Sequence, residues 1–119
     1  VVFNNGAVGN VVSATATRLT VTLTTRPTSA GPLTAVVTTN GVANATPVQV
    51  ARVTPVVTQR ASSLARTADT IVINGFGFNP VAPGNTVTFN NGATGTISSA
   101  TATSLTVTFV NKPVAAGLL

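Results

Sequence analysis

Hydrophobic and polar residues alternate along short stretches of the chain. No segment has hydrophobic residues that recur every 3.6 residues, the period of an α-helix. The clearest case is residues 15–23, where Leu19, Val21 and Leu23 alternate with threonines. Alternation over about four to eight residues is typical of a β-strand with one face in the core and one in water. The same pattern predicts strands at residues 1–4, 8–13, 33–39, 48–53, 56–57, 69–73 and 85–90. We therefore predict an all-β fold of antiparallel strands.

Asn-Gly pairs lie between or after several of these predicted strands, namely Asn5-Gly6, Asn40-Gly41 and Asn91-Gly92. Both residue types tolerate the positive φ that tight hairpin turns require, so each pair predicts a turn. Thr54-Pro55 is different, because proline lacks the N–H that a strand in a sheet donates. We interpret Thr54-Pro55 as a domain boundary.

The chain contains an internal repeat. An offset of 86 positions places Val1 on Val87 and aligns residues 1–33 with residues 87–119 without a gap. Twenty of these 33 pairs are identical, namely those at Val1, Phe3 to Ala7, Gly9, Ser13 to Thr17, Leu19 to Thr22, Pro27, Ala30, Gly31 and Leu33. A fixed period of this size indicates a tandem array of one small domain.

The period of 86 residues defines the predicted domains. Residues 1–54 are predicted to be the C-terminal part of one immunoglobulin-like repeat, and residues 55–119 the N-terminal part of the next. One period holds about seven or eight short strands, the number that a two-sheet immunoglobulin-like sandwich needs. The fold-class prediction is therefore an all-β, immunoglobulin-like β-sandwich in tandem repeats.

The period also makes predictions about the ends. The segment after Leu119 should match residues 34–54, and a strand matching residues 69–73 should precede Val1. We expect the chain to be either a segment of a longer continuous polypeptide or a unit completed by strands of its neighbours. In both cases its partners are neighbouring repeats or copies of itself, which should cover the apolar faces of residues 1–3 and 118–119.

Burial can be predicted from the same alternation. The predicted core between the two sheets consists of Leu19, Val21, Phe76, Phe89, Leu105, Val107 and Phe109. Positions with a charged residue that differ between the aligned segments should lie in water, where divergence is tolerated most easily. These exposed positions are Arg18 with Ser104 and Arg26 with Lys112.

The Gly-rich run Ile71-Val-Ile-Asn-Gly-Phe-Gly-Phe-Asn-Pro80 resembles the IPT/TIG group of immunoglobulin-like domains. The Asn-Asn-Gly-Ala turn and the Ala-Thr-x-Leu-Thr-Val strand are similar to tandem repeats of very large bacterial surface proteins. The resemblance implies a β-sandwich and no activity. It also implies that Gly75 and Gly77 permit a sharp strand exit, and that Phe76 and Phe78 fill the core. Members of the group that bind DNA use basic loops, which are absent here, so DNA binding is not implied.

Charge changes the interpretation little. The net charge of +5 comes from six bases against the single acid Asp69, and only 6% of the residues are charged. No two bases are adjacent, so we predict no nucleic-acid partner, although a weak contact with anionic glycans stays open. A surface of Thr, Ser, Asn and Gly is typical of secreted bacterial repeat proteins. We predict an extracellular or cell-surface location, with no apolar run long enough to span a membrane.

Candidate catalytic chemistry is almost absent from the sequence. There is no His or Cys and only one carboxylate side chain, so we predict no enzyme activity, no catalytic residues, no cofactor and no metal site. Bacterial surface immunoglobulin-like domains often carry Lys–Asn isopeptide cross-links, whose formation a buried acid catalyses. Lys112, Asp69 and the asparagines of this chain supply the residue types for such a cross-link. The residue that matches Lys112 in the other segment is Arg26, whose guanidinium cannot attack, so we favour a solvated charge at a strand end.

These observations favour a structural role. We expect a repeat unit of a large secreted or cell-surface bacterial protein that assembles head to tail into a stalk, fibre or filament. The alternative is an adhesin module that binds carbohydrate or a surface protein. Such a module is expected to carry exposed aromatic side chains for stacking on sugars, and the chain has neither Tyr nor Trp.

Overall fold

The computed structural model describes residues 1–60 and 62–119, and the chain divides into two compact units. Unit 1 is Val1–Thr54 and unit 2 is Pro55–Leu119. In the described residues the regular structure consists of β-strands and one short 3-10 helix, and every strand pair is antiparallel. The predicted all-β fold class is confirmed. Its assignment to the IPT/TIG type, and of the two units to parts of repeats, stays a prediction.

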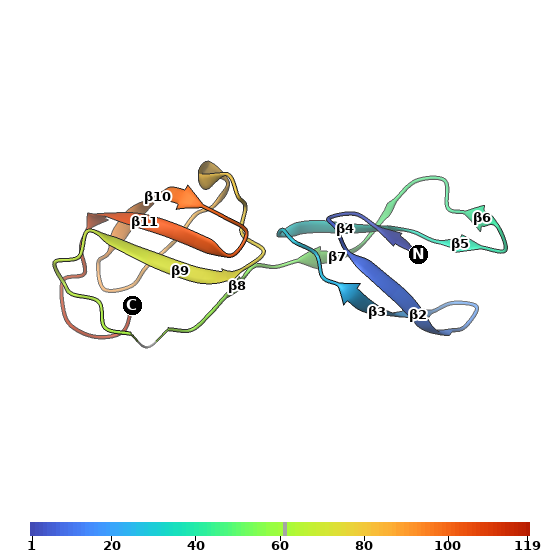
Figure 1. The fold of residues 1–119 in the computed structure, drawn as a ribbon, viewed down its shortest axis with the longest axis horizontal. Coiled ribbons are helices and arrows are strands. Elements are labelled where there is room, and N and C mark those ends of the chain that lie inside the picture. Colours follow the sequence, from blue (N-terminus) through green and yellow to red (C-terminus); the bar gives the residue numbers. More distant parts are fainter. Residues whose placement is uncertain (61) are drawn as a thin grey trace. The chain divides into compact units, whose positions relative to one another are not determined.

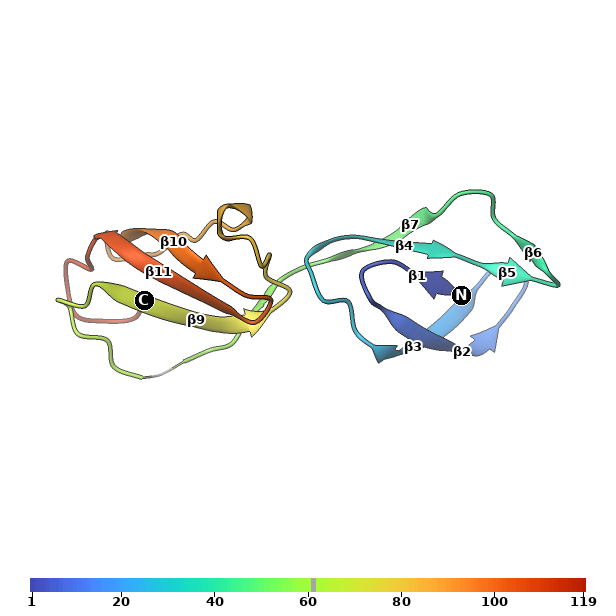
Figure 2. The same cartoon turned by 45° about the horizontal axis from the view of Figure 1, so that its top comes forward.

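Unit 1 has three small sheets (Figure 1). Its strands are β1 (Val2–Phe3), β2 (Val8–Ala14), β3 (Leu19–Thr25), β4 (Gly31–Val36), β5 (Thr38–Thr39), β6 (Val42–Ala43) and β7 (Val48–Val53). One sheet has the order β1-β4-β7, and the other two are the hairpins β2-β3 and β5-β6. Figure 2 shows the β2-β3 hairpin on one side of unit 1 and the β1-β4-β7 sheet on the other, which gives this unit a sandwich-like layering.

The buried core of unit 1 is small. Ala7, Leu33 and Ala35 are buried, and the alternation of buried and half-buried residues along β4 places Leu33 and Ala35 on its inner face. The β5-β6 hairpin is turned by Asn40 and Gly41, both of which have positive φ (51° and 78°). This turn confirms the conformation predicted for the Asn40-Gly41 pair.

Unit 2 contains one four-stranded sheet (Figure 1). Its strands are β8 (Val56–Val57), β9 (Thr70–Phe76), β10 (Thr94–Ala100) and β11 (Ser104–Asn111), and their order in the sheet is β10-β11-β9-β8. The 3-10 helix η1 (Ala82–Gly84) follows β9. The first part of the Gly-rich run, as far as Phe76, therefore lies in strand β9.

The core of unit 2 is larger and includes aromatic rings. Its buried side chains are Phe78, Ala93, Leu105, Val107 and Phe109. Phe89 is half-buried and packs on Phe109, with ring centroids 5.6 Å apart at a tilt of 51°. The predicted burial of Leu105, Val107 and Phe109 is confirmed.

The predicted burial of Phe76 is wrong, since this side chain is 64% exposed. Along β9 the inward positions are Ile71, Ile73 and Gly75, so Phe76 points to the opposite face. Phe78 instead turns back over Gly75: a Cβ built on Gly75 would lie 2.6 Å from the Phe78 ring. Of the two phenylalanines that the resemblance placed in the core, only Phe78 lies there.

The predicted burial of Leu19 is also wrong, and Val21 is only half-buried. Both residues lie on the inner face of β3, as the alternation predicts, but β3 has a neighbouring strand on one side only. The exposed positions agree better with the prediction, because Arg18, Arg26 and Lys112 are exposed while Ser104 is half-buried.

Three predicted strand boundaries also differ. Residues 85–90 form no strand, and residues 15–18 form the turn before β3, closed by a hydrogen bond from Thr15 N to Arg18 O. The strand predicted at residues 33–39 is divided between β4 and β5. Alternation reports which residues could form strands, whereas pairing with a neighbour decides which of them do.

Candidate functional site

The hairpins β2-β3 and β10-β11 are built alike. In the first, Val11 lies opposite Val21 and Ala14 opposite Leu19. In the second, the matching pairs are Ile97 with Val107 and Ala100 with Leu105, and both hairpins carry register shifts at matching places.

A glycine is required at the same place in both hairpins. A Cβ on Gly9 would lie 2.6 Å from Val21 Cγ1, and a Cβ on Gly95 would lie 2.6 Å from Val107 Cγ1. Since real Cβ atoms do not approach so closely, the glycines allow the inner valines to pack against the neighbouring backbone.

The turns before the two hairpins match as well. Asn5 and Gly6 have φ values of 57° and 69°, and Asn91 and Gly92 have values of 55° and 67°. The Asn5 side-chain amide donates to Ser29 O at 2.6 Å, and the Asn91 amide donates to Ala115 O at 2.5 Å. The predicted Asn-Gly turns are confirmed, and each one ties its hairpin to a loop 24 residues further on.

The neighbours of the two hairpins differ. In unit 2, β11 lies between β10 and β9, with Leu105 opposite Ile73 and Val107 opposite Ile71. In unit 1, β3 pairs with β2 alone among the described residues. The other side of β3 is therefore a free strand edge, a row of backbone N–H and C=O groups able to accept another strand.

The matching side chains of β3 and β11 differ in burial, because in the described residues only β11 has a strand on both sides. Leu105 is 4% exposed and Val107 is fully buried, whereas Leu19 is 39% exposed and Val21 half-buried. Phe109 is 9% exposed, and the matching Leu23 is 38% exposed. The free edge of β3 thus borders an apolar stripe that is covered in unit 2.

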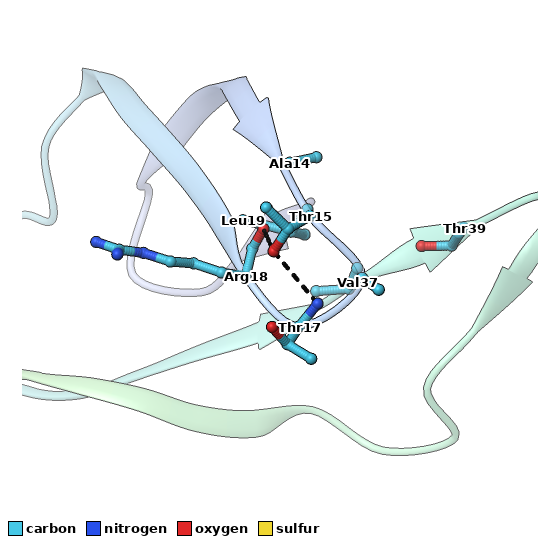
Figure 3. Close-up of a pocket in the computed structure, with 8 residues that line it drawn as sticks. Ala14, Thr15, Thr17, Arg18, Leu19, Val37 and Thr39 are labelled. Carbon is cyan, nitrogen blue, oxygen red and sulfur yellow. Dashed lines mark hydrogen bonds between the residues drawn. The ribbon is translucent and has the colours of Figure 1, made fainter.

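An open depression lies next to this edge in unit 1 (Figure 3). It has a volume of about 470 Å³ and is lined by residues 14–19, Val37 and Thr39. The turn is held by Thr15, whose hydroxyl donates to Arg18 O and accepts from Thr17 N, both at 3.4 Å. In Figure 3 the Arg18 side chain extends away from Val37 and Thr39.

In unit 2 the end of β9 and the residues that follow it run beside the corresponding turn. Gly75 N donates to Thr103 O at 2.9 Å, and Phe78 N donates to Ala102 O at 3.1 Å. Phe78 itself is 4% exposed. Residues Thr103 and Ala102 match Thr17 and Ala16, which line the depression in unit 1.

A second unpaired segment lies in unit 2. In unit 1, β1 pairs with β4, and Asn4 reinforces this pair through a hydrogen bond from Thr34 N to Asn4 Oδ1 at 2.8 Å. The matching residues Val87 to Asn90 have no strand partner in the described parts of the chain. In the described residues, β3 thus lacks the second neighbour that the matching β11 has, and residues 87–90 lack the strand partner that the matching β1 has.

The charged side chains in the described part of the chain form one ion pair. Lys112 Nζ lies 2.7 Å from Asp69 Oδ1 and donates to Thr67 O at 2.8 Å. The hydrogen bond from Lys112, together with its positive charge, lowers the pKa of the Asp69 carboxyl below its ordinary value. Because Asp69 is exposed, this pair is a solvated charge contact, and no buried acid is available to it for a cross-linking reaction.

In the described residues no group of three or more His, Cys, Asp or Glu side chains is placed to hold a metal ion. No helix found there is long and apolar enough to cross a membrane. No protein-family model, curated protein or solved structure matches the chain. The candidate site consists of the unpaired edge of β3 and the depression at the turn that precedes it. The apolar stripe on β3 could be found from its alternation, but the depression has no sequence signal of its own.

Proposed function

We propose that this chain belongs to a tandem array of immunoglobulin-like, IPT/TIG-type sandwich repeats in a large secreted or cell-surface bacterial protein, with a structural role as stalk, fibre or filament. The observation that carries the proposal is the matched pair of hairpins. Their registers, bulges, glycines and Asn-capped turns correspond at an offset of 86 positions.

The units supply complementary parts of such a sandwich. Unit 2 provides the four-stranded sheet β10-β11-β9-β8, and unit 1 provides the three-stranded sheet β1-β4-β7. A repeat with both sheets has seven strands, the number of a constant-type immunoglobulin-like sandwich. Neighbouring repeats are the proposed partners, and their contacts would cover the apolar faces at residues 1–3 and 118–119.

Stiffness is the property that such an array contributes. Repeats that contact only their neighbours form a quasi-one-dimensional chain, whose length grows with the number of repeats. A surface of hydroxyl and amide groups keeps the array hydrated outside the cell without dense charge. The proposed location is accordingly extracellular or at the cell surface.

The test is to extend the chain by further copies of residues 34–119, which continue the aligned sequence after Leu119, and to measure the maximum dimension by small-angle X-ray scattering. A compact domain of this size has a radius of gyration of about 12 Å, so each block should add on the order of 30 Å. The matched control is a Gly/Ser extension of equal length, whose end-to-end distance grows as the square root of length. Compact growth, or growth like that of the control, contradicts the proposal.

Exposed Phe76 favours a second candidate function, the adhesin module. Phe76 lies on the outer face of β9 with Asn74 and Val72, where an aromatic ring could stack on a sugar. The test is a glycan array that includes anionic glycans, probed with the full chain and with the Phe76→Ser variant. Val42→Ser, at an exposed valine of unit 1, is the control. Binding that is absent, or is unaffected by Phe76→Ser, contradicts this function.

A further inference from the structure

Strands β8 and β9 are joined by a connector, residues 58–69, whose described part forms no strand or helix (Figure 1). Residues 58–60 and 62–67 are exposed. Among the described residues, the backbone between Thr58 and Ala65 forms no hydrogen bond. Exposed segments with few backbone hydrogen bonds open easily, and they are the places where proteases preferentially cut folded proteins.

A turn in the connector, Ala65–Ala68, presents Arg66 to solvent. The turn is closed by a backbone hydrogen bond of 2.9 Å between its end residues, and Arg66 and Thr67 are its central residues. Lys112 Nζ holds the chain on the far side of Arg66, since it contacts Thr67 O at 2.8 Å and Asp69 Oδ1 at 2.7 Å. The carbonyl of Arg66 accepts no hydrogen bond in the described structure, so it is free to be bound by another molecule.

Two of the six bases of the chain are protected from arginine-specific endopeptidases by sequence. Such an enzyme takes the basic side chain into an acidic pocket and breaks the bond that follows it. Arg26 and Lys112 are each followed by a proline, whose ring at the nitrogen makes this bond a poor substrate. Pro27 and Pro113 match at the offset of 86 positions, so the protection is repeated in both units.

Two further bases are protected by structure. Arg18 O accepts hydrogen bonds from Thr15 N at 2.7 Å and from the Thr15 hydroxyl at 3.4 Å, so this carbonyl is not free for the oxyanion hole of a protease. Arg52 lies in β7, which is paired with β4. A paired strand must open before it fits an extended binding cleft. The two remaining bases, Arg60 and Arg66, both lie in the connector and are exposed.

We propose that the connector is a processing site for an arginine-specific endopeptidase outside the cell, whose acidic pocket takes Arg66 or Arg60. At Arg66 the enzyme hydrolyses the bond to Thr67. The oxygen of water bonds to the Arg66 carbonyl carbon as the C–N bond breaks, Arg66 becomes a carboxylate, and the Thr67 nitrogen takes up protons as an ammonium group. This inference goes beyond the proposed structural role and rests on it for the location of the enzyme.

Cutting the connector divides unit 2. Strand β8 stays on the N-terminal product, whereas β9, β10 and β11 stay on the other. Within unit 2, β8 is paired with β9 over two residues, Val56 and Val57, which are 54% and 64% exposed. Such a short ladder, with little buried area, is too weak to hold two separate chains together. We expect the products to separate, so processing would shorten an array one period at a time.

The test is limited digestion of the full chain with trypsin, followed by intact mass spectrometry. The first products should end at Arg66 or Arg60. They should form about tenfold or more faster than any product that ends at Arg18 or Arg52, because cutting there requires a hydrogen-bonded segment to open. First products that end at Arg18 or Arg52 overturn the proposal.

Two double variants of the full chain make a matched pair. Arg60→Gln with Arg66→Gln keeps the connector polar and removes the positive charges that the pocket binds, so cutting should slow about a hundredfold or more. Arg18→Gln with Arg52→Gln removes the same number of charges elsewhere and should be cut like the parent. Circular dichroism checks that both variants unfold at the parent's midpoint. Equal rates for the two double variants contradict the assignment of the site.

The release is measured on the cut chain. The two products should elute separately in size-exclusion chromatography at micromolar concentration. Products that elute together contradict the release of the array at the connector.

The same digestion on the chain extended by one further copy of residues 34–119 tests the site within a continuing array. The connector is then present twice, so cutting at both copies should give a fragment of 86 residues, one period. A connector that is cut in the 119-residue chain but protected in the extended chain overturns the proposal. Linear growth of the extended chains without cutting leaves the structural function and removes the processing site, whereas cutting without linear growth does the reverse.

Discussion

Strands β3 and β11 share the run Leu-Thr-Val-Thr, at residues 19–22 and 105–108, yet β3 is an edge strand and β11 lies inside a sheet. The hairpin register and bulges are shared, so the local geometry does not cause the difference. The difference comes from β9, which covers β11 and has no counterpart on β3 in the described residues. Local sequence thus determines the shape of the hairpin, while its neighbour determines the burial.

The largest effect should come from truncating the matched leucines. Leu105→Ala should lower the free energy of unfolding of unit 2 by about 2 to 5 kcal/mol, because a buried leucine leaves a cavity. Leu19→Ala should cost unit 1 about 1 kcal/mol or less, since much of that side chain is already in water. Hydrogen exchange resolved by residue reports the two units separately. Equal losses would show that burial differs less between the two strands than the structure indicates.

The next comparison should give equal effects. Gly9→Ala and Gly95→Ala each place a Cβ 2.6 Å from a valine methyl, so each should destabilise its own unit by about 1 to 3 kcal/mol. The readout is the denaturant midpoint of each unit, followed by hydrogen exchange. Because this contact lies within the hairpin, a large difference between the two losses would show that β9 also shapes the hairpin.

Smaller effects are expected at the turns. Asn5→Ala removes three side-chain hydrogen bonds and Asn91→Ala removes one, and both place alanine at positive φ, so each should cost about 1 to 2 kcal/mol, with the larger loss at Asn5. Asn5→Gly and Asn91→Gly keep the backbone freedom and remove only the side-chain hydrogen bonds, so they should cost less. A glycine variant as unstable as its alanine partner would assign the whole effect to the hydrogen bond.

The smallest effect concerns pH. The pKa of Asp69 is lowered in the folded chain, so its contact with Lys112 stabilises unit 2 above the ordinary pKa of 3.8. This stability is lost as the pH falls from that value through the lowered pKa. Asp69→Asn should remove the contribution, as followed by unfolding of unit 2 between pH 2 and 6. Unit 1 has no Asp or Glu, so it should show no comparable dependence.

Much of the fold could be predicted from the sequence, because alternation and Asn-Gly pairs act locally. The all-β class, the turns at Asn5 and Asn91, and the buried face of β11 required only neighbouring residues. Phe76 was placed wrongly because the resemblance put both phenylalanines in the core, whereas strand alternation allows only one side of β9 to face inward.

The candidate site was only partly predictable. The apolar stripe on β3 is visible in its alternation. The depression depends on the approach of Val37 and Thr39 to the turn at residues 14–19, which no local pattern encodes. Residues 85–90 alternate like a strand but do not form one in the structure. Alternation carries no information about which segment lies alongside to pair with them.

The Asn-Gly turns also have a consequence for how the protein ages. An asparagine followed by glycine is prone to deamidation: the glycine nitrogen attacks the side-chain carbonyl, ammonia leaves, and water opens the resulting succinimide to an acidic residue. The amides of Asn5 and Asn91 are held by loop carbonyls, and Asn74 is held within the paired strand β9, whereas Asn40 lies in a turn and has no side-chain hydrogen bond in the described structure. We expect Asn40 to deamidate first, as peptide mapping by mass spectrometry would show. In a chain with a single acid, each such event would give a distinct charge form, so stored preparations should separate into discrete species on isoelectric focusing.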